Sequence, residues 1–253
     1  MAHHWRTIDL DALAQTPLPA LEAGVAHLWR IRLDASTRRA ARVEHVLDEH
    51  ETSRADRYIK PAHGANFRIA HGALRLILGG YAGEDPSAIE FSRGERDKPA
   101  LTHHAELEFN LSHSGDWALI GLMIGAQLGV DTEHARAARA TPALAAYAFS
   151  PLEAKRLEDV ERADRAAAFY RIWTRKEAFI KAIGLGLHFD LEAFDVEHEP
   201  TTTPKLLGLR APALEPMARW RFFSGMIEEH YPFAICSNAP IDGVETFELT
   251  IGE

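Results

Sequence analysis

The chain has 253 residues, 46% of them hydrophobic, and a formal net charge of −9, which suits one large domain or two of about 125 residues. An acidic chain disfavours nucleic acid or an anionic membrane as the main partner. The single cysteine, Cys236, excludes an internal disulfide framework and a cysteine metal cluster. Because no apolar run approaches the ~18 residues of a membrane span and residues 1–10 lack a signal-peptide pattern, we expect a soluble cytoplasmic protein.

The first part of the chain predicts a strand followed by helices. Residues 25–33 alternate between apolar and polar side chains, apart from Leu28, as in a half-buried strand. We expect a helix from residues 34–36 to about 51, and a helical stretch over 52–81 that Pro61 and Gly64 interrupt. Arg54 and Arg68 belong to this stretch, which is the most basic part of the chain. A solvated helix face explains most of its arginines, and a phosphate-binding surface is the alternative, because guanidinium groups match phosphate.

Residues 89–124 predict short strands joined by polar turns. Lys98 and Pro99 lie in one such turn, and residues 107–114 and 117–124 read as two strands with a tight turn between them. Ser112 and His113 do not suit a nucleophile and its base, because adjacent strand residues point to opposite faces and no G-x-S-x-G turn is present. Either the pair binds an anion, or the serine caps the turn and the histidine packs against the protein.

Two carboxylates follow in the segment QLGVDTE, residues 127–133. If this segment is extended, Asp131 and Glu133 share a face and repel each other unless a cation lies between them. Mg²⁺ prefers oxygen ligands and usually takes one or two carboxylates, water and substrate phosphate. D-x-E is a common pattern, so solvated carboxylates at a strand end are the alternative.

The stretch FYRIWTRKEAFIKAIGLG, residues 169–186, predicts a helix with an unusual distribution of charge. Its apolar residues gather on one face, and Gly184 and Gly186 end it. Lys176 projects into the middle of that apolar face, with Glu177 and Lys181 at the edge. A surface ion pair at i,i+4 spacing would explain the last two residues. The alternative is a groove that holds anions and a metal ion, and Lys176 favours it because a lysine is rarely buried without a partner.

The remaining segments predict further helices and strands. Ser150, Pro151 and Glu153 mark a helix start, and a second helix begins at Asp164. Strands are expected at residues 194–196, 218–224, 232–237 and 246–251, with a Thr/Pro-rich loop over 200–216. The pattern around His113 is weakly repeated around His230, which suggests two related α+β halves with a boundary near Ala126.

Taken together, these segments resemble the 4′-phosphopantetheinyl transferases of the Sfp type. The matching pieces occur in the order that the family has, over about residues 50–190. They are Lys98-Pro99, FNLSHS at 109–114, GVDTE at 129–133, Phe149-Ser150, and WTRKEAFIK at 173–181 followed by Gly184-x-Gly186. The resemblance implies an α+β (α/β) fold of two pseudo-symmetric halves, residues 1–126 and 127–253, each a small antiparallel sheet packed on helices, with coenzyme A between them.

The resemblance also implies roles for individual residues. Asp131, Glu133 and Glu177 would hold Mg²⁺ on the pyrophosphate of coenzyme A, and Glu177 would be the general base. Lys181 and His113 would bind pyrophosphate oxygens. The adenosine end and its 3′-phosphate would contact Lys98, Pro99, Ser112, Arg68 and, less strongly supported, Arg54, and Lys176 would line the same groove.

The implied reaction moves the phosphopantetheine arm of coenzyme A to a serine of an apo acyl or peptidyl carrier protein. Because the chain is itself acidic, we expect it to bind this acidic partner locally, through the segment Arg136–Arg139 and the helix after Thr141. Two fused halves favour a monomer. Two rival functions remain at this point: a Mg²⁺-dependent pyrophosphatase acting on coenzyme A or a nucleotide, and a non-catalytic protein that binds coenzyme A or a carrier.

Overall fold

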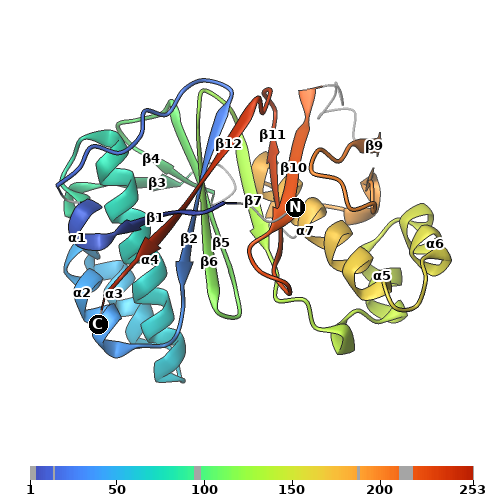
Figure 1. The fold of residues 1–253 in the computed structure, drawn as a ribbon, viewed down its shortest axis with the longest axis horizontal. Helices are drawn as coiled ribbons and strands as arrows, with labels where there is room; N and C mark the ends of the chain where they lie inside the picture. Colours follow the sequence, from blue (N-terminus) through green and yellow to red (C-terminus); the bar gives the residue numbers. More distant parts are fainter. Residues whose placement is uncertain (1–3, 14, 94–97, 187–188, 211–218, 253) are drawn as a thin grey trace.

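The computed structural model describes residues 4–13, 15–93, 98–186, 189–210 and 219–252 (Figure 1). The helices in these ranges are α1 Leu10–Leu13, α2 Thr37–Val43, α3 Glu49–Asp56, α4 Pro61–Ala82, α5 Pro142–Ala148, α6 Pro151–Asp159 and α7 Arg165–Ile183. The strands are β1 Arg6–Asp9, β2 Val25–Arg32, β3 Phe91–Arg93, β4 Pro99–Leu101, β5 Leu107–Ser114, β6 Trp117–Ile124, β7 Leu128–Thr132, β8 Phe194–Val196, β9 Leu206–Leu209, β10 Arg221–Met226, β11 Pro232–Ser237 and β12 Gly243–Thr250.

Two sheets pack face to face between two groups of helices (Figure 1). A five-stranded sheet has the order β1-β12-β2-β6-β5, and a three-stranded sheet has the order β10-β11-β7. Helices α2, α3 and α4 lie on the outer side of the first sheet, and α7 lies on the outer side of the second. The strand pairs β3–β4 and β8–β9 are small separate sheets. This arrangement is the mixed α+β fold that the sequence predicts.

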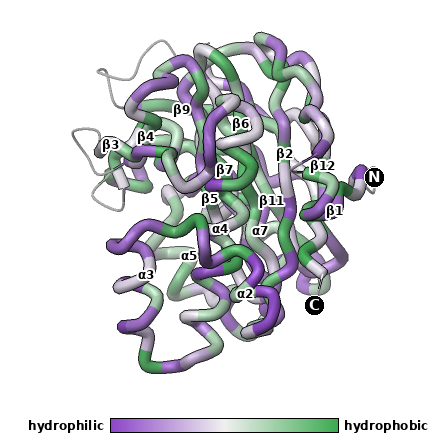
Figure 2. Tube along the Cα trace, turned by 90° about the vertical axis from the view of Figure 1, so that its left-hand side faces the viewer, coloured by the Kyte–Doolittle hydropathy of each residue, from purple (hydrophilic) through white to green (hydrophobic). Residues whose placement is uncertain are grey.

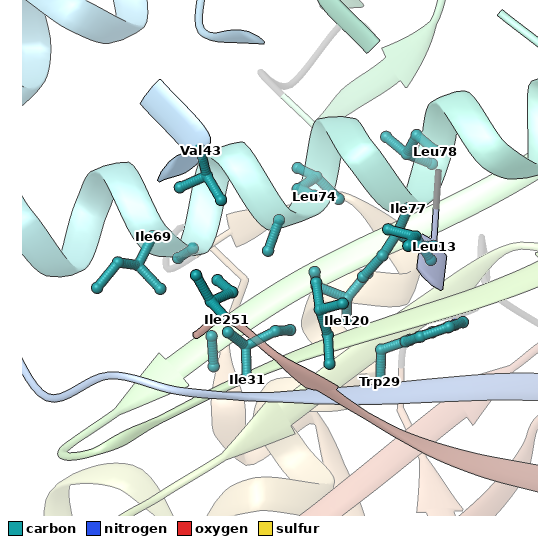
Figure 3. Close-up of a cluster of buried hydrophobic side chains, with 14 of the residues drawn as sticks. Leu13, Trp29, Ile31, Val43, Ile69, Leu74, Ile77, Leu78, Ile120 and Ile251 are labelled. Atoms are coloured by element: carbon teal, nitrogen blue, oxygen red, sulfur yellow. The ribbon is translucent and has the colours of Figure 1, made fainter. Parts of the chain in front are cut away.

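Helix α4 forms the core of the first half with the five-stranded sheet. Pro61 occupies its first turn, and Gly83 ends it with a left-handed φ of 70°. Its apolar stripe lies above the sheet (Figure 3). The residues in contact include Ile69, Leu74 and Ile77 from α4 and Trp29, Ile31, Ile120 and Ile251 from the sheet side.

A second apolar layer joins the two sheets to each other. Leu28 and Leu119 of the first sheet and Val130 and Ile235 of the second are fully buried in one cluster. Strand β6 is therefore apolar on both faces. The exposed helix α3, in contrast, is mostly hydrophilic and purple in Figure 2. Because these contacts bury apolar side chains on both sides, the two halves form one continuous packing unit.

The chain does not divide cleanly at residue 126. Strand β12, near the C-terminus, lies in the five-stranded sheet and pairs in parallel with β2 and with β1 (Figure 1). The first sheet is therefore mixed, whereas the prediction was a purely antiparallel one. Antiparallel pairing holds for β2–β6, β5–β6 and the whole of the second sheet. The proposed boundary between two halves stays a prediction, and β12 crosses it.

Several predicted element bounds need correction. The helix expected from residues 34–36 to about 51 is two helices. Helix α2 ends at Val43, and α3 begins at Glu49 after the N-cap Asp48, which forms a capping box with Glu51. Gly64 does not interrupt α4. Part of the loop expected over 200–216 is strand β9, and the strand expected at 218 begins at Arg221; residues 211–218 lie outside the described ranges. Among the helices described, none has the length and apolar character needed to cross a membrane.

Candidate active site

The candidate site lies where β5, β7 and α7 meet. Strand β7 and helix α7 approach each other closely at Gly129, where a Cβ atom would come within 2.0 Å of the Ala178 carbonyl oxygen. Any other residue would force the helix away from the strand. The sequence G-V-D-T-E therefore needs its glycine so that side chains of α7 can reach the carboxylates of β7.

Three residues of α7 lie along one side of the helix at i, i+4 and i+8, facing these carboxylates. They are Trp173, Glu177 and Lys181. Lys181 bonds to Asp131, Trp173 lies close enough to Glu133 to lower the pKa of that carboxyl, and Glu177 lies between them in sequence. The helix ends just beyond, at Gly184, whose φ of 69° provides the predicted left-handed cap.

Asp131 is almost completely buried, with 4% of its surface exposed, and its two oxygens have different surroundings. Oδ1 accepts hydrogen bonds from Lys181 Nζ at 2.7 Å and from Ser112 Oγ at 2.9 Å. Oδ2 is buried and has no hydrogen-bond partner among the described residues. Burial raises the pKa of this carboxyl, against the opposing charge of Lys181. A buried carboxylate oxygen left unpaired is costly unless a ligand completes it, so Oδ2 is suited to contact a cation.

Glu133 follows Asp131 on the same face of the extended chain. Its Oε2 accepts a hydrogen bond from Ser114 Oγ at 2.7 Å. Burial raises its pKa, and the negative charge of Asp131 raises it further. The repulsion expected from the sequence is therefore present in the structure.

Glu177 is half-buried, and the pKa of its carboxyl lies well above its usual value. Burial, followed by the negative charges of Asp131 and Glu133, raises its pKa to about 7, while Lys181 opposes this shift. A carboxyl group that titrates near neutral pH can accept a proton from an attacking group and release it again. Its electrostatic surroundings thus suit a general base.

His113 connects the carboxylates to the cavities of the first half. Burial lowers the pKa of its imidazole, and the positive charges of His71, Lys181 and Arg54 lower it further. Lys181 also donates to Ser112 Oγ at 2.9 Å. Cationic and polar donors therefore border the acidic cluster on one side, as binding of a pyrophosphate requires.

Two cavities lie beside this cationic side and share Phe67 and His71 in their walls. The larger, of about 550 Å³, is lined by Asp48, His50, Glu51, Arg54, Phe67, His71, Leu74, Phe91, Pro99 and Phe109. The smaller, of about 310 Å³, includes His113 and Gly115. Aromatic walls with a few polar groups are typical of sites for planar organic ligands.

The structure separates the two arginines that the sequence analysis grouped. Arg54 lines the larger cavity, with its guanidinium 5.1 Å from the centre of the Phe67 ring. Arg68 lies in a different hollow, where it pairs with Asp56 and with Glu44. Arg54, which had the weaker support, is therefore at the candidate site, and Arg68 is not brought to it.

Lys98 and Pro99 lie at the edge of the site. Pro99 lines the larger cavity. Lys98 Nζ donates to Glu108 Oε2 at 2.9 Å and to the Leu128 carbonyl at 3.0 Å, so it ties β5 to the start of β7. An ammonium group has three protons, so a further acceptor such as a phosphate oxygen can still be bound.

The interpretation of Lys176 as a groove residue is wrong. Only 1% of its surface is exposed, and its Nζ donates at 2.6 Å to both Glu153 Oε2 and the Phe194 carbonyl. Glu153 belongs to the capping box that begins α6, and it is also buried. Lys176 thus has the partner that its burial demands, and this partner lies in the core of the second half.

Two contributors were missed from the sequence. Ser114 donates a hydrogen bond to Glu133 and Trp173 lies close to it, yet neither was predicted to have a role in the site. A signal was present for both, since Trp173 precedes Glu177 by one helical turn and Ser114 follows Ser112 on the same strand face. The bonding partners themselves depend on the packing of β7 between β5 and α7.

The acidic side chains of the site supply oxygen atoms of the kind that bind a divalent cation. Within the described ranges, no three or more His, Cys, Asp or Glu side chains form a ready-made metal cage. Asp131, Glu133 and Glu177 are nevertheless near enough for their charges to affect one another, and Asp131 Oδ2 is unpaired. Mg²⁺ commonly binds with one or two carboxylates and takes its other ligands from water and substrate phosphate. The residues therefore fit Mg²⁺ bound together with a phosphate-containing substrate.

Comparison with known proteins agrees with this geometry. A family model described as the 4′-phosphopantetheinyl transferase superfamily matches residues 127–236. The chain is 36% identical over 197 residues to 4′-phosphopantetheinyl transferase HetI of Nostoc sp., covering 77% of this chain and 83% of that protein. It is 27% identical over 228 residues to a 4′-phosphopantetheinyl transferase of Bacillus subtilis, covering 89% of this chain and 92% of that protein.

A likeness to the solved structure of Thermotoga maritima holo-[acyl-carrier-protein] synthase has 17% identity and a TM-score of 0.33, over 45% of this chain and 63% of that one. That likeness is too weak to support an argument. The family model, however, spans Asp131, Glu133, Glu177 and Lys181, and the match to HetI extends over most of both chains. The chain therefore belongs to the 4′-phosphopantetheinyl transferase superfamily.

Proposed function

We propose that this enzyme transfers the 4′-phosphopantetheine arm of coenzyme A to a serine hydroxyl of an apo acyl or peptidyl carrier protein, with Mg²⁺ as cofactor. The observation that carries the proposal is the arrangement around Asp131. One of its oxygens is held by Lys181 and Ser112, the other is buried and unpaired, and Glu177 with a pKa near 7 lies beside it. Such a site can neutralise a pyrophosphate and accept a proton from an attacking hydroxyl.

The proposed reaction is a displacement at phosphorus. The serine oxygen forms a bond to the phosphorus that carries the pantetheine arm, and the bond from that phosphorus to the bridging oxygen breaks. Adenosine 3′,5′-bisphosphate leaves with that bond's electron pair, and Glu177 takes the serine proton. A bound Mg²⁺, held by Asp131, Glu133 and Glu177, would neutralise charge on the pyrophosphate oxygens.

The remaining residues bind and orient coenzyme A. Lys181 and His113 would contact pyrophosphate oxygens. Lys181 bonds to Asp131, and the charges of both Lys181 and Asp131 affect the pKa of His113, which supports this role. The larger cavity, with Arg54 and Pro99 in its wall, suits the adenosine end and its 3′-phosphate. Lys98, which bonds to the Leu128 carbonyl at the start of β7, and Ser112, which bonds to Asp131, would contribute further donors.

Incubation with coenzyme A, Mg²⁺ and an apo carrier protein tests the proposal. The expected result is that the intact mass of the carrier rises by one phosphopantetheine group, and that a carrier with its serine replaced by alanine gains nothing. Release of phosphopantetheine without a carrier would indicate the rival pyrophosphatase. Tight binding of coenzyme A without either product would indicate a non-catalytic binding protein.

The carrier is proposed to bind at the surface formed by residues 136–139 and α5. Arg136 and Arg139 are exposed, and Tyr147 of α5 is 83% exposed. Interfaces are enriched in arginine and aromatic residues, and carriers of this kind are acidic. We therefore expect the double variant Arg136→Glu/Arg139→Glu to raise KM for the carrier about tenfold and to leave KM for coenzyme A unchanged.

A matched control is the double variant Arg6→Glu/Arg38→Glu, which changes the net charge equally on the first half. Steady-state kinetics with varied carrier concentration should show wild-type KM values for it. Equal effects of the two double variants would point to long-range charge instead of this surface, and no effect of either would place the carrier elsewhere.

A further inference from the structure

A row of hydrogen bonds from backbone to side chain joins β7 to β5, although these two strands belong to different sheets. Backbone N–H groups of β7 and the residues after it donate to side-chain oxygens of β5. The bonds run from Val130 N to Asn110 Oδ1 at 2.8 Å, from Thr132 N to Ser112 Oγ at 3.4 Å, and from His134 N to Ser114 Oγ at 3.0 Å. Because residues two apart share a strand face, three polar side chains in the pattern N-x-S-x-S hold one edge of β7.

The two serines each make a second bond, to a carboxylate. Ser112 Oγ donates to Asp131 Oδ1 at 2.9 Å, and Ser114 Oγ donates to Glu133 Oε2 at 2.7 Å. A hydroxyl has one proton and two acceptor positions, so each serine gives its proton to the acid and accepts the N–H of the following residue. The same pair of bonds therefore occurs twice, one pleat apart along both strands.

This repeated pair of bonds fixes where each carboxylate points. In each pair the serine hydroxyl donates to one oxygen of the acid and accepts the backbone N–H of the residue that follows the acid. The second oxygen of Asp131 is buried and has no hydrogen-bond partner within the part of the chain that the structure describes. Hydrogen bonds of this kind orient metal ligands and commonly affect metal affinity when they are removed.

We infer that Ser114 is a positioning residue for Glu133, holding its carboxylate ready for the divalent cation of the metal-dependent transfer proposed above, on which this inference rests. Ser114 is a cleaner probe than Ser112, which also accepts a hydrogen bond from Lys181. Ser114 acts through Glu133 and does not itself touch the reacting atoms.

Direct binding of Mn²⁺, followed by electron paramagnetic resonance in the presence of coenzyme A, tests the inference. Ser114→Ala is expected to weaken Mn²⁺ binding about tenfold and to raise the Mg²⁺ concentration for half-maximal rate similarly. Ser114→Thr keeps the hydroxyl and suits a strand, so it should restore wild-type affinity. KM for coenzyme A at saturating Mg²⁺ should stay near the wild-type value.

Ser237→Ala is the matched control, because Ser237 is a fully buried serine on β11 that accepts the Ala239 N–H and pairs with Leu128, at the other end of β7 from the acids. It should leave Mn²⁺ affinity unchanged. Wild-type Mn²⁺ affinity in Ser114→Ala, or a weakening that Ser114→Thr shares, would overturn the inference. Since this measurement needs no carrier protein, its outcome is separate from the transfer assay, whose failure would instead overturn the proposed function.

Discussion

Glu177→Gln is expected to lower the rate of phosphopantetheine transfer by about 10²- to 10⁴-fold, because it removes the group proposed to accept the serine proton. Glutamine has nearly the same shape but cannot take up a proton at neutral pH. KM for coenzyme A should change much less than kcat, since other side chains line the cavities. Both kcat and KM for coenzyme A can be measured at saturating Mg²⁺ by following the mass of the carrier with mass spectrometry.

The same substitution should make the metal-free protein more stable at alkaline pH. In the folded protein the pKa of Glu177 is raised to about 7 from its usual 4.5. Between these values the folded state binds the proton more tightly than the unfolded state, so this group's contribution to stability falls as pH rises from about 4.5 to 7. Glutamine does not ionise, so the variant does not lose this contribution to stability as pH rises. We expect a gain on the order of 1 kcal/mol in the free energy of unfolding at pH 8 with a chelator present, and little change at pH 5.

Urea unfolding at the two pH values provides the measurement. An inactive but stabilised Glu177→Gln variant would show that the loss of rate is not a loss of folding. The prediction fails if the variant keeps more than about a tenth of the wild-type rate, or if it is destabilised equally at both pH values. Glu192→Gln, an acid in the short turn before β8, is a suitable control for the change of charge.

Lys176→Met is expected to destabilise the protein by about 3–5 kcal/mol, the largest stability change among these variants. The substitution would leave Glu153 buried, with 1% of its surface exposed, and without its partner at 2.6 Å. Burial already raises the pKa of Glu153 and lowers that of Lys176, so each charge depends on the other. Urea unfolding at pH 7 measures the loss.

Two further variants show whether the pair is the cause. Glu153→Gln combined with Lys176→Met should recover part of the loss, because no uncompensated charge then remains in the core. Lys155→Met, at an exposed position of α6, should change stability by less than about 0.5 kcal/mol. If Lys176→Met lowered the free energy of unfolding by less than about 1 kcal/mol, the structural role of Lys176 would be contradicted. A role for this lysine in the groove would then have to be considered again.

Local patterns in the sequence were sufficient for most elements that build the site. The hairpin of β5 and β6 follows from alternation and a turn, and β11 has the predicted bounds, residues 232–237. The start of α6 follows from a capping box, and the end of α7 from Gly184. These features depend on neighbouring residues alone, since periodicity and caps act over one or two turns. The ordered motifs were likewise enough to indicate the family.

Only the tertiary structure decided which charged groups meet. Lys176 and Glu153 are 23 residues apart, and Lys181 and Asp131 are 50 apart, so no local pattern tells which lysine enters the core and which enters the site. Arg54 and Arg68 look alike in sequence but line different hollows. Strand β12 completes the first sheet from more than 200 residues away along the chain. Such pairings follow from how whole layers pack, because a buried charge is satisfied by whichever partner the fold brings within reach, wherever it lies in the sequence.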